Sequence, residues 1–214
     1  MRRTKEEAEI TKRNLLAAAL EVFSRKGYTA TRVEDIAMQA NVTTGAIYHH
    51  FGGKSELYIA LIEDSSAKAN QLAQQVVEEG GTPASILRRL LVRLFEFAEE
   101  DKEYRAVLEL FLNMTEISPE VALINQQILE SRRLLAQFFS ALIQDGIVEG
   151  EFHSRVSPEI AALTLVGFMN GMGLIWLQDS EFFSIKTQAE DLVDSFLSGI
   201  VTYFPITGCL CLFI

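Results

Sequence analysis

Histidine, cysteine and carboxylate side chains could support catalysis or metal binding, and their spacing in this sequence speaks against both. His49 and His50 are neighbours, and neither an HExxH motif nor a Glu-x-x-His pair occurs. His153 lies near Glu149 and Glu151 and could bind a metal, but a solvated polar loop explains these residues better. We therefore expect no catalytic residue, no metal and no cofactor.

The cysteines and the N-terminal residues predict no further site. Cys209 and Cys211 lie in an apolar C-terminal segment with no other cysteine or nearby histidine, which is unlike a zinc site or a disulfide framework. Arg2, Arg3 and Lys5 lead into an amphipathic segment rather than a hydrophobic run, so no signal peptide is predicted. We expect a cytoplasmic protein.

Residues 43–54 suggest a different chemistry, because their side chains suit the surface of a nucleic acid. Thr43 and Thr44 are hydroxyls at a predicted helix N-terminus, where backbone N–H groups attract phosphate. Gly45 and Ala46 would bring the backbone close to base edges, and Ala46 could touch a thymine methyl group. Other polar side chains could contact phosphate or base: Tyr48, His49 and Lys54.

Packing is the competing interpretation for two of these aromatic positions. Tyr48 could cover the core with its hydroxyl in water, and His50 could pack beside Phe51.

Two short helices would position these residues. A leading helix is predicted over about 4–25, ended by Gly27. Thr31 and Glu34 form a capping box, and an apolar helical face follows at Val33, Ile36, Ala37 and Ala40. Asn41 can adopt the left-handed conformation that a sharp turn needs.

A second cap follows this turn directly. Thr43 is placed to cap the next helix, with Val42 and Ile47 as the two members of a hydrophobic staple. Gly52 and Gly53 would end that helix after Phe51. Two capped short helices behind a longer one are the plan of a helix-turn-helix.

The rest of the chain also favours helices. It has 214 residues, 49% of them hydrophobic, and apolar residues recur three and four apart rather than alternating. A hydroxyl residue followed by proline predicts three helix starts, at Pro83, Pro119 and Pro158. We expect an all-α protein of about nine or ten helices. The predicted domains are a helix-turn-helix domain over 1–53 and a larger helical domain over 54–214, with helix 54–79 connecting them.

The net charge of −10 is unevenly divided. Residues 1–60 hold nine Lys and Arg against seven Asp and Glu, whereas residues 61–214 hold ten against twenty-two. Because phosphate binding depends on Lys and Arg, only the N-terminal part suits a nucleic-acid partner.

The sequence resembles the tetracycline-repressor (TetR) family over about its first sixty residues. The stretch 45–57, GAIYHHFGGKSEL, looks like the family's signature, and further positions fall in the family's order and spacing: Phe23, Gly27, Tyr28, Thr31, Val33, Ile36, Ala37, Val42 and Tyr58. Two departures are Thr44 and Gly52-Gly53, the latter in place of the more usual polar residue plus Asn. They bear on the operator sequence rather than on the mode of binding.

The resemblance implies which residues touch DNA. Contacts would come from Thr43, Thr44, Gly45, Tyr48, His49, His50 and Lys54, with Tyr48, His50 and Lys54 mostly on phosphates. The predicted DNA-binding set also includes Thr31, Arg32 and Ala46.

The C-terminal part is rich in aromatic residues and methionines, most of which we expect in the core. A cavity between helices lined by such residues is nevertheless a usual place for an apolar ligand. We predict a mostly apolar effector pocket that draws on Phe97, Phe111, Met114, Phe138, Phe168, Met172 and Trp176.

The resemblance also implies a homodimer formed by the last two long helices. The segment from Pro158 to about Gln178 has the right place in the chain, and its glycines would let another helix come close. The segment from about Lys186 to Phe204 would be its partner helix. The predicted interface residues are Gly167, Gly171, Phe196 and Ile200.

Membrane insertion is an alternative for the same region. Residues 160–178 carry no charge and are about long enough to span a bilayer, but Thr164, Asn170 and the glycines weaken that interpretation, and no Lys/Arg cluster flanks the segment. We therefore expect no membrane partner. The apolar C-terminal tail has no explanation beyond docking on a neighbour.

The resemblance implies a ligand-responsive DNA-binding regulator, most simply a repressor that a small, largely apolar effector releases from a palindromic operator. A helical enzyme is one alternative, for which the sequence offers little. A structural adaptor is another, and it would leave the positive N-terminal part and the capped recognition helix without a purpose.

Overall fold

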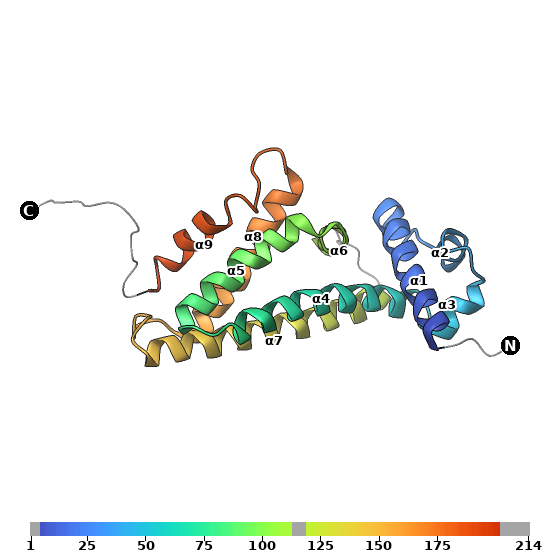
Figure 1. Ribbon diagram of the computed structural model, residues 1–214. Coiled ribbons are helices and arrows are strands. Elements are labelled where there is room, and N and C mark those ends of the chain that lie inside the picture. Colours follow the sequence, from blue (N-terminus) through green and yellow to red (C-terminus); the bar gives the residue numbers. More distant parts are fainter. Residues whose placement is uncertain (1–4, 113–118, 202–214) are drawn as a thin grey trace, which may run out of the picture. The chain divides into compact units, whose positions relative to one another are not determined.

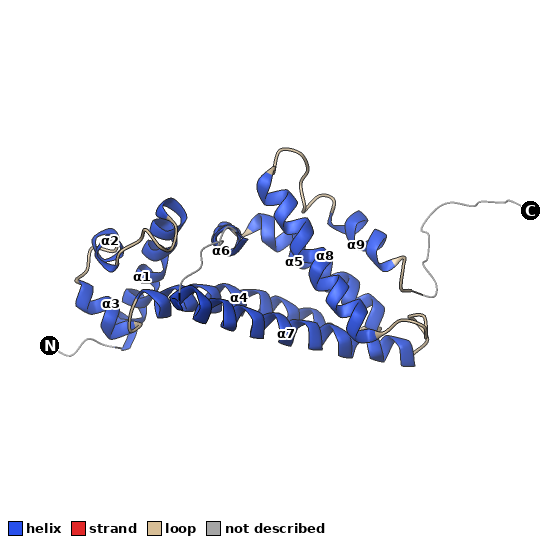
Figure 2. Cartoon of the chain, turned by 180° about the vertical axis from the view of Figure 1, so that it is seen from behind, coloured by secondary structure: helices blue, strands red, loops and turns tan. Residues whose placement is uncertain are grey.

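The computed structural model describes residues 5–112 and 119–201, and over these ranges the chain forms nine α-helices and no strand (Figure 1). Colouring by secondary structure shows helices joined by loops throughout the described part (Figure 2). The all-α prediction is confirmed. The helices are α1 (Lys5–Lys26), α2 (Val33–Gln39), α3 (Thr44–His50), α4 (Lys54–Glu78), α5 (Pro83–Glu100), α6 (Lys102–Leu112), α7 (Pro119–Val148), α8 (Pro158–Gln178) and α9 (Ala189–Leu197).

The contacts between residues in space divide the chain into two compact units. The first contains the described residues up to Ala73 together with Phe97–Arg132, and the second contains Gln74–Glu96 with the described residues from Arg133 onward. The predicted boundary after residue 53 separates DNA binding from ligand binding, which is a different division, and it stays a prediction. The first compact unit joins α1–α3 with most of α4, with α6 and with the start of α7.

The first unit has a core built from the helix faces that the apolar spacing predicts. Leu15, Ala19 and Phe23 of α1 are fully buried, as are Ile36 of α2 and Ile47 of α3. The same cluster is completed by residues of α4 and α7: Leu57, Leu61, Ile124 and Ile128. Burial of these side chains is what holds the short helices α2 and α3, which would be unstable alone.

The second unit packs α5, the second half of α7, α8 and α9 around aromatic side chains. Phe139, Phe152 and Trp176 are almost completely buried. Phe168 of α8 lies between two rings, edge-on to Phe95 of α5 at 5.9 Å and stacked on Phe196 of α9 at 5.0 Å. Their burial and ring contacts join three helices of this unit.

Arginine–carboxylate pairs add to the packing of the second unit. Arg88 of α5 binds two carboxylates of α9, that of Asp194 through Nε at 2.6 Å and that of Glu190 through Nη2 at 2.9 Å. These pairs fix α9 along α5.

The predicted helix starts and one predicted end can be compared directly. Helices α5, α7 and α8 begin at Pro83, Pro119 and Pro158, as expected, and the Ser157 hydroxyl accepts a hydrogen bond from the Ile160 N–H. The predicted last helix is too long, because α9 spans Ala189–Leu197 and Ser198 follows as its C-cap. The predicted end at Phe204 lies outside the described residues.

Helix α8 is long and apolar enough to cross a membrane, by length and composition alone, and it is the one such helix in the part of the chain that the structure describes. A helix in the core of a soluble protein can be equally long and apolar. Within α8 the Thr164 hydroxyl and the Asn170 amide donate hydrogen bonds to the carbonyl oxygens of Ile160 and Val166.

Candidate nucleic-acid interface

The start of α2 is fixed by charged groups rather than by the predicted threonine cap. Arg32 is the N-cap, and its backbone N–H donates to the Asp35 carboxylate at 3.0 Å. The Lys26 ammonium lies 2.8 Å from the same carboxylate. The hydrogen bond from Lys26, followed by that from the Arg32 N–H, lowers the pKa of Asp35 below its ordinary value.

The predicted capping box of Thr31 with Glu34 is therefore wrong by one residue. Thr31 is 2% exposed, and its hydroxyl donates to the Gly27 carbonyl oxygen at 2.7 Å. This bond to the preceding turn removes the hydroxyl from the helix terminus, so the cap passes to the next residue along the chain.

The turn between α2 and α3 agrees with the sequence pattern. Asn41 has φ of 53°, the left-handed conformation predicted for it. Thr43 is the N-cap of α3, although its side chain makes no capping hydrogen bond. Val42 and Ile47, the predicted staple, both pack into the first core, which holds α3 against α2.

Helix α3 has one anchored and one open side. Ile47 is 0% exposed, whereas Tyr48 is 57% exposed, and Gly45 and His49 are exposed as well. A Cβ atom added at Gly45 would meet only the Thr43 hydroxyl, at 3.7 Å, so the fold itself does not require glycine there. The open side therefore carries a glycine and no Lys, Arg, Asp or Glu, which suits close approach to base edges.

The structure places the ten predicted DNA-binding residues differently with respect to solvent. Arg32, Thr43, Gly45, Tyr48 and His49 are exposed; Thr44, Ala46, His50 and Lys54 are half-buried; Thr31 is buried. The rings of His49 and His50 lie 5.3 Å apart, and His50 also lies 6.4 Å from Phe51. The exposed positions and the half-buried Thr44 and Ala46 belong to the two capped helix starts and to α3.

Lys54 differs from the other predicted contacts because its ammonium faces its own chain. Its Nζ donates to the carbonyl oxygens of Tyr28 and Thr31, each at 3.2 Å. The same atom lies 4.3 Å from the centre of the Tyr28 ring.

The residues predicted to bind an effector do not form one described site. Phe168, Met172 and Trp176 follow one another along α8, with Trp176 1% exposed, while Phe138 of α7 is 38% exposed. Phe97 belongs to the first unit, where its ring lies 4.8 Å from that of Tyr104. The side chains of Phe111 and Met114 lie outside the described residues. The aromatic effector pocket stays a prediction.

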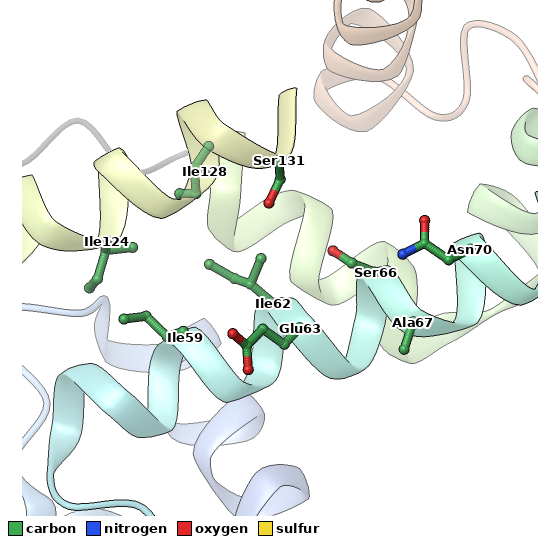
Figure 3. A pocket seen from close by; sticks show the side chains of 9 residues that line it. All are labelled: Ile59, Ile62, Glu63, Ser66, Ala67, Asn70, Ile124, Ile128 and Ser131. Atoms are coloured by element: carbon green, nitrogen blue, oxygen red, sulfur yellow. The ribbon is translucent and has the colours of Figure 1, made fainter. Parts of the chain in front are cut away.

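A pocket in the first unit is lined by residues that the sequence analysis did not single out (Figure 3). It has a volume of about 230 Å³ and lies between α4 and α7. Its lining combines apolar and polar side chains: Ile59, Ile62, Glu63, Ser66, Ala67, Asn70, Ile124, Ile128 and Ser131. The missed signal is helical spacing, since these positions recur three and four apart on both helices.

The predicted dimer residues lie on two helices and the segment that follows them. A Cβ atom added at Gly167 or Gly171 of α8 would meet nothing within 4 Å. On the same helix Ile160 and Leu163 are each 63% exposed. The other two predicted residues have contacts within their own chain: Phe196 stacks on Phe168, and the Ile200 carbonyl accepts a hydrogen bond from the His153 N–H at 3.0 Å.

Two capped helices at a tight turn, with an open face on the second, define a helix-turn-helix DNA-binding protein. Residues 15–61 match the family described as bacterial regulatory proteins, tetR family, and residues 82–201 match the C-terminal region of MAATS-type transcriptional repressors. The chain belongs to the TetR family of bacterial transcriptional regulators.

Relatives that match along most of their length agree with this assignment. The HTH-type transcriptional regulator AcrR of Shigella flexneri is 30% identical over 197 residues, which cover 90% of each chain. TtgR of Pseudomonas putida is 28% identical over 196 residues, covering 91% of this chain and 93% of that one. The crystal structure of NalD from Pseudomonas aeruginosa is 26% identical with a TM-score of 0.83, and the match covers 94% of this chain and 100% of NalD.

Proposed function

We propose that this regulator is a homodimeric repressor that binds a palindromic operator through α3 and leaves it when a small, mostly apolar effector binds. The observation that carries the proposal is the open face of α3, where Tyr48 and His49 are exposed over the buried anchor Ile47. NalD, of similar fold throughout its length, is described as the secondary repressor of a multidrug efflux pump, which favours repression over activation.

The DNA contacts follow from this face. In a dimer the two copies of α3 would enter successive major grooves about 34 Å apart, so the operator would be palindromic. Thr43, Gly45 and Ala46 allow the backbone to approach the bases, and Tyr48 and His49 can donate hydrogen bonds to bases or phosphates.

The dimer would form through α8 and α9. The exposed apolar residues of α8 share one stripe with Gly167 and Gly171, whose missing side chains leave room for a helix of the second copy. This use of α8 also supports a soluble cytoplasmic protein over a membrane-inserted one.

The effector would bind between helices of the larger domain, as a mostly apolar molecule. The pocket of Figure 3 supports this class of ligand, because four isoleucines face it while Glu63, Ser66 and Asn70 offer a few polar contacts. The aromatic residues Phe168, Met172 and Trp176 remain proposed contributors.

Regulation without catalysis is part of the proposal. The relatives AcrR and TtgR are both named as transcriptional regulators, which supports a role in DNA binding rather than in a chemical reaction. Within 5–112 and 119–201, no group of three or more His, Cys, Asp or Glu side chains could hold a metal ion.

Binding can be measured by fluorescence anisotropy with a labelled duplex from the region upstream of the chain's own gene. We expect Tyr48→Ala to weaken binding by about tenfold or more, because one good contact near a base or phosphate contributes roughly 1–3 kcal/mol. Val148→Ser is the matched control, since Val148 is 76% exposed and lies far along the chain from α3.

Two results would contradict the proposal. Absence of binding by the unaltered chain at low salt would remove the DNA-binding half. The effector half would fail if no lipophilic compound in a screen raised the melting temperature and also released the duplex.

A further inference from the structure

We propose that Lys54 is a positioning residue for operator binding, which ties the first turn of α4 to the turn before α2, rather than a residue that neutralises a DNA phosphate. The inference rests on the proposed function, and it departs from the phosphate contact that family resemblance implies for this lysine.

The ammonium group already has partners within the first unit. Of its three N–H donors, two are used by the carbonyl oxygens of Tyr28 and Thr31 at 3.2 Å. The Tyr28 ring lies beneath it at 4.3 Å, within the range in which a ring face attracts a cation. One N–H donor remains, and a phosphate could take it without displacing Nζ only by approaching the ammonium where it lies.

The turn that accepts these bonds has hydrogen bonds of its own. Gly27 has φ of 77° and its N–H donates to Phe23, while the Thr31 hydroxyl returns to the Gly27 carbonyl at 2.7 Å. The Thr31 N–H donates to the Tyr28 carbonyl at 3.2 Å. Lys54 therefore binds a turn whose backbone is already hydrogen-bonded within the domain.

A second contact lies one helical turn further along α4. The Tyr58 ring meets Phe23 at 5.1 Å and Tyr28 at 5.2 Å, both edge to face, and Tyr28 stacks on Phe23 at 5.8 Å. Lys54 and Tyr58 are four residues apart, so both side chains project from the same side of the helix.

This clamp, formed by Lys54 and Tyr58 on the Tyr28 turn, reaches the recognition helix through a very short connection. Only Phe51, Gly52 and Gly53 separate α3 from Lys54, and Gly52 has φ of 99°. A displacement of the first turn of α4 would therefore displace α3 as well. Holding the first turn of α4 on the Tyr28 turn therefore keeps α3 in place relative to α1 and α2.

The test compares Lys54→Met with Arg25→Met, which removes the same charge from an exposed position of α1 just before the turn. Methionine keeps the apolar stem over the ring but has no donor. We expect Lys54→Met to lower the melting temperature by about 2–4 °C in the absence of DNA, and Arg25→Met to change it by about 1 °C or less. Operator affinity of Lys54→Met should fall severalfold, while its slope of log K against log salt stays within about one unit of the original.

A third readout separates positioning from a general loss of stability. Below the melting transition of both proteins, the Lys54→Met variant should discriminate less than the unaltered chain between its operator and a version with one base pair inserted at the centre. A change that only lowered stability would leave this ratio unchanged.

Each alternative outcome is distinct. A phosphate contact predicts that Lys54→Met reduces the salt slope by about 1.8, one contact of about 0.9 from each subunit, with an unchanged melting temperature, and that result would overturn the inference. If Lys54→Met did not fold, Lys54→Gln, which loses the charge but keeps N–H donors, would carry the salt measurement. If the unaltered chain bound no duplex, the proposed function would fail first, while the melting comparison would still test the clamp.

Discussion

Single residues in α3 and its surroundings divide into anchors and contacts. Ile47 has no exposed surface and serves the fold, whereas Tyr48, next to it in the chain, has more than half of its surface in water. Thr31 shows that a polar residue can also be an anchor, because its hydroxyl is bonded to the Gly27 carbonyl. Chemical type alone therefore does not identify a DNA contact in this protein.

Gly146 gives a prediction at the same scale. A Cβ atom there would lie 2.5 Å from Cε2 of Phe152 and 3.3 Å from Cβ of Pro83, and Phe152 is 1% exposed. We expect Gly146→Ala to destabilise the protein by about 1–3 kcal/mol, the usual cost of overpacking a core. Chemical denaturation would measure the loss.

Gly199→Ala is the matched control for this substitution. Its Cβ would make only an ordinary contact, 3.5 Å from the Phe196 carbonyl oxygen, so the stability should change by no more than about 0.5 kcal/mol. Equal stability of the two variants would mean that the ring of Phe152 moves aside freely.

At the scale of helices, α4 is joined to α6 by charge. The Lys68 ammonium lies 2.8 Å from Glu103 and 3.3 Å from Asp101, and the Asp101 carboxylate also accepts the N–H of Tyr104 at 2.9 Å, which caps α6. The hydrogen bond to Glu103 raises the pKa of Lys68. Burial raises the pKa of Asp101, but the Tyr104 N–H and Lys68 together lower it further, so the net shift is downward.

The signs of these shifts predict how stability depends on pH. Because its pKa is lowered, ionised Asp101 stabilises the fold above the unfolded pKa of about 3.9, and this stabilisation is lost as the pH falls through the folded pKa. Because its pKa is raised, protonated Lys68 stabilises the fold below the unfolded pKa of about 10.4, and this stabilisation is lost as the pH rises through the folded pKa. Lys68→Met should therefore lower the melting temperature by a similar small amount from about pH 5 to 9.

The acid limit provides the check on this pairing. In acid below the lowered pKa of Asp101, the melting temperatures of Lys68→Met and the unaltered chain should converge to within about 1 °C, because that carboxyl is then protonated. A gap that persisted there would show that the stem of Lys68, rather than its charge, holds the two helices.

Helix type and most helix starts could be predicted from the sequence, because apolar spacing and Ser/Thr-Pro pairs are local signals. The cap of α2 could not, since the Thr31 hydroxyl has two possible partners and only the folded turn selects Gly27. The length of α9 was overestimated because its apolar spacing continues past the C-cap at Ser198. The pocket of α4 and α7 was missed because Ile59 and Ile124 are distant in sequence and carry no aromatic signal.

At the scale of the whole molecule, the open stripe of α8 predicts the oligomeric state. Gly167 is exposed with nothing near its missing side chain, so Gly167→Leu should fold normally as a single chain but push apart a helix packed against it. We expect the dimer to weaken by at least about tenfold and operator affinity to fall with it. Sedimentation over a range of concentrations would measure the first effect.

The control for the dimer is Val148→Ser, at an exposed position outside α8. It should sediment as the unaltered chain does. If Gly167→Leu remained fully dimeric at the same concentrations, the second copy would have to bind elsewhere.

Helix α3 carries no lysine, arginine, aspartate or glutamate, and residues 61–214 hold twelve more acidic than basic residues. Nonspecific binding of this protein to chromosomal DNA would thus release few counterions and be weak. The acidic larger part of the chain would also be repelled by the DNA phosphates. Most copies would remain in solution instead of being sequestered across the nucleoid. A small cellular pool could then keep one control site filled, and that site could empty quickly once the pool is switched off.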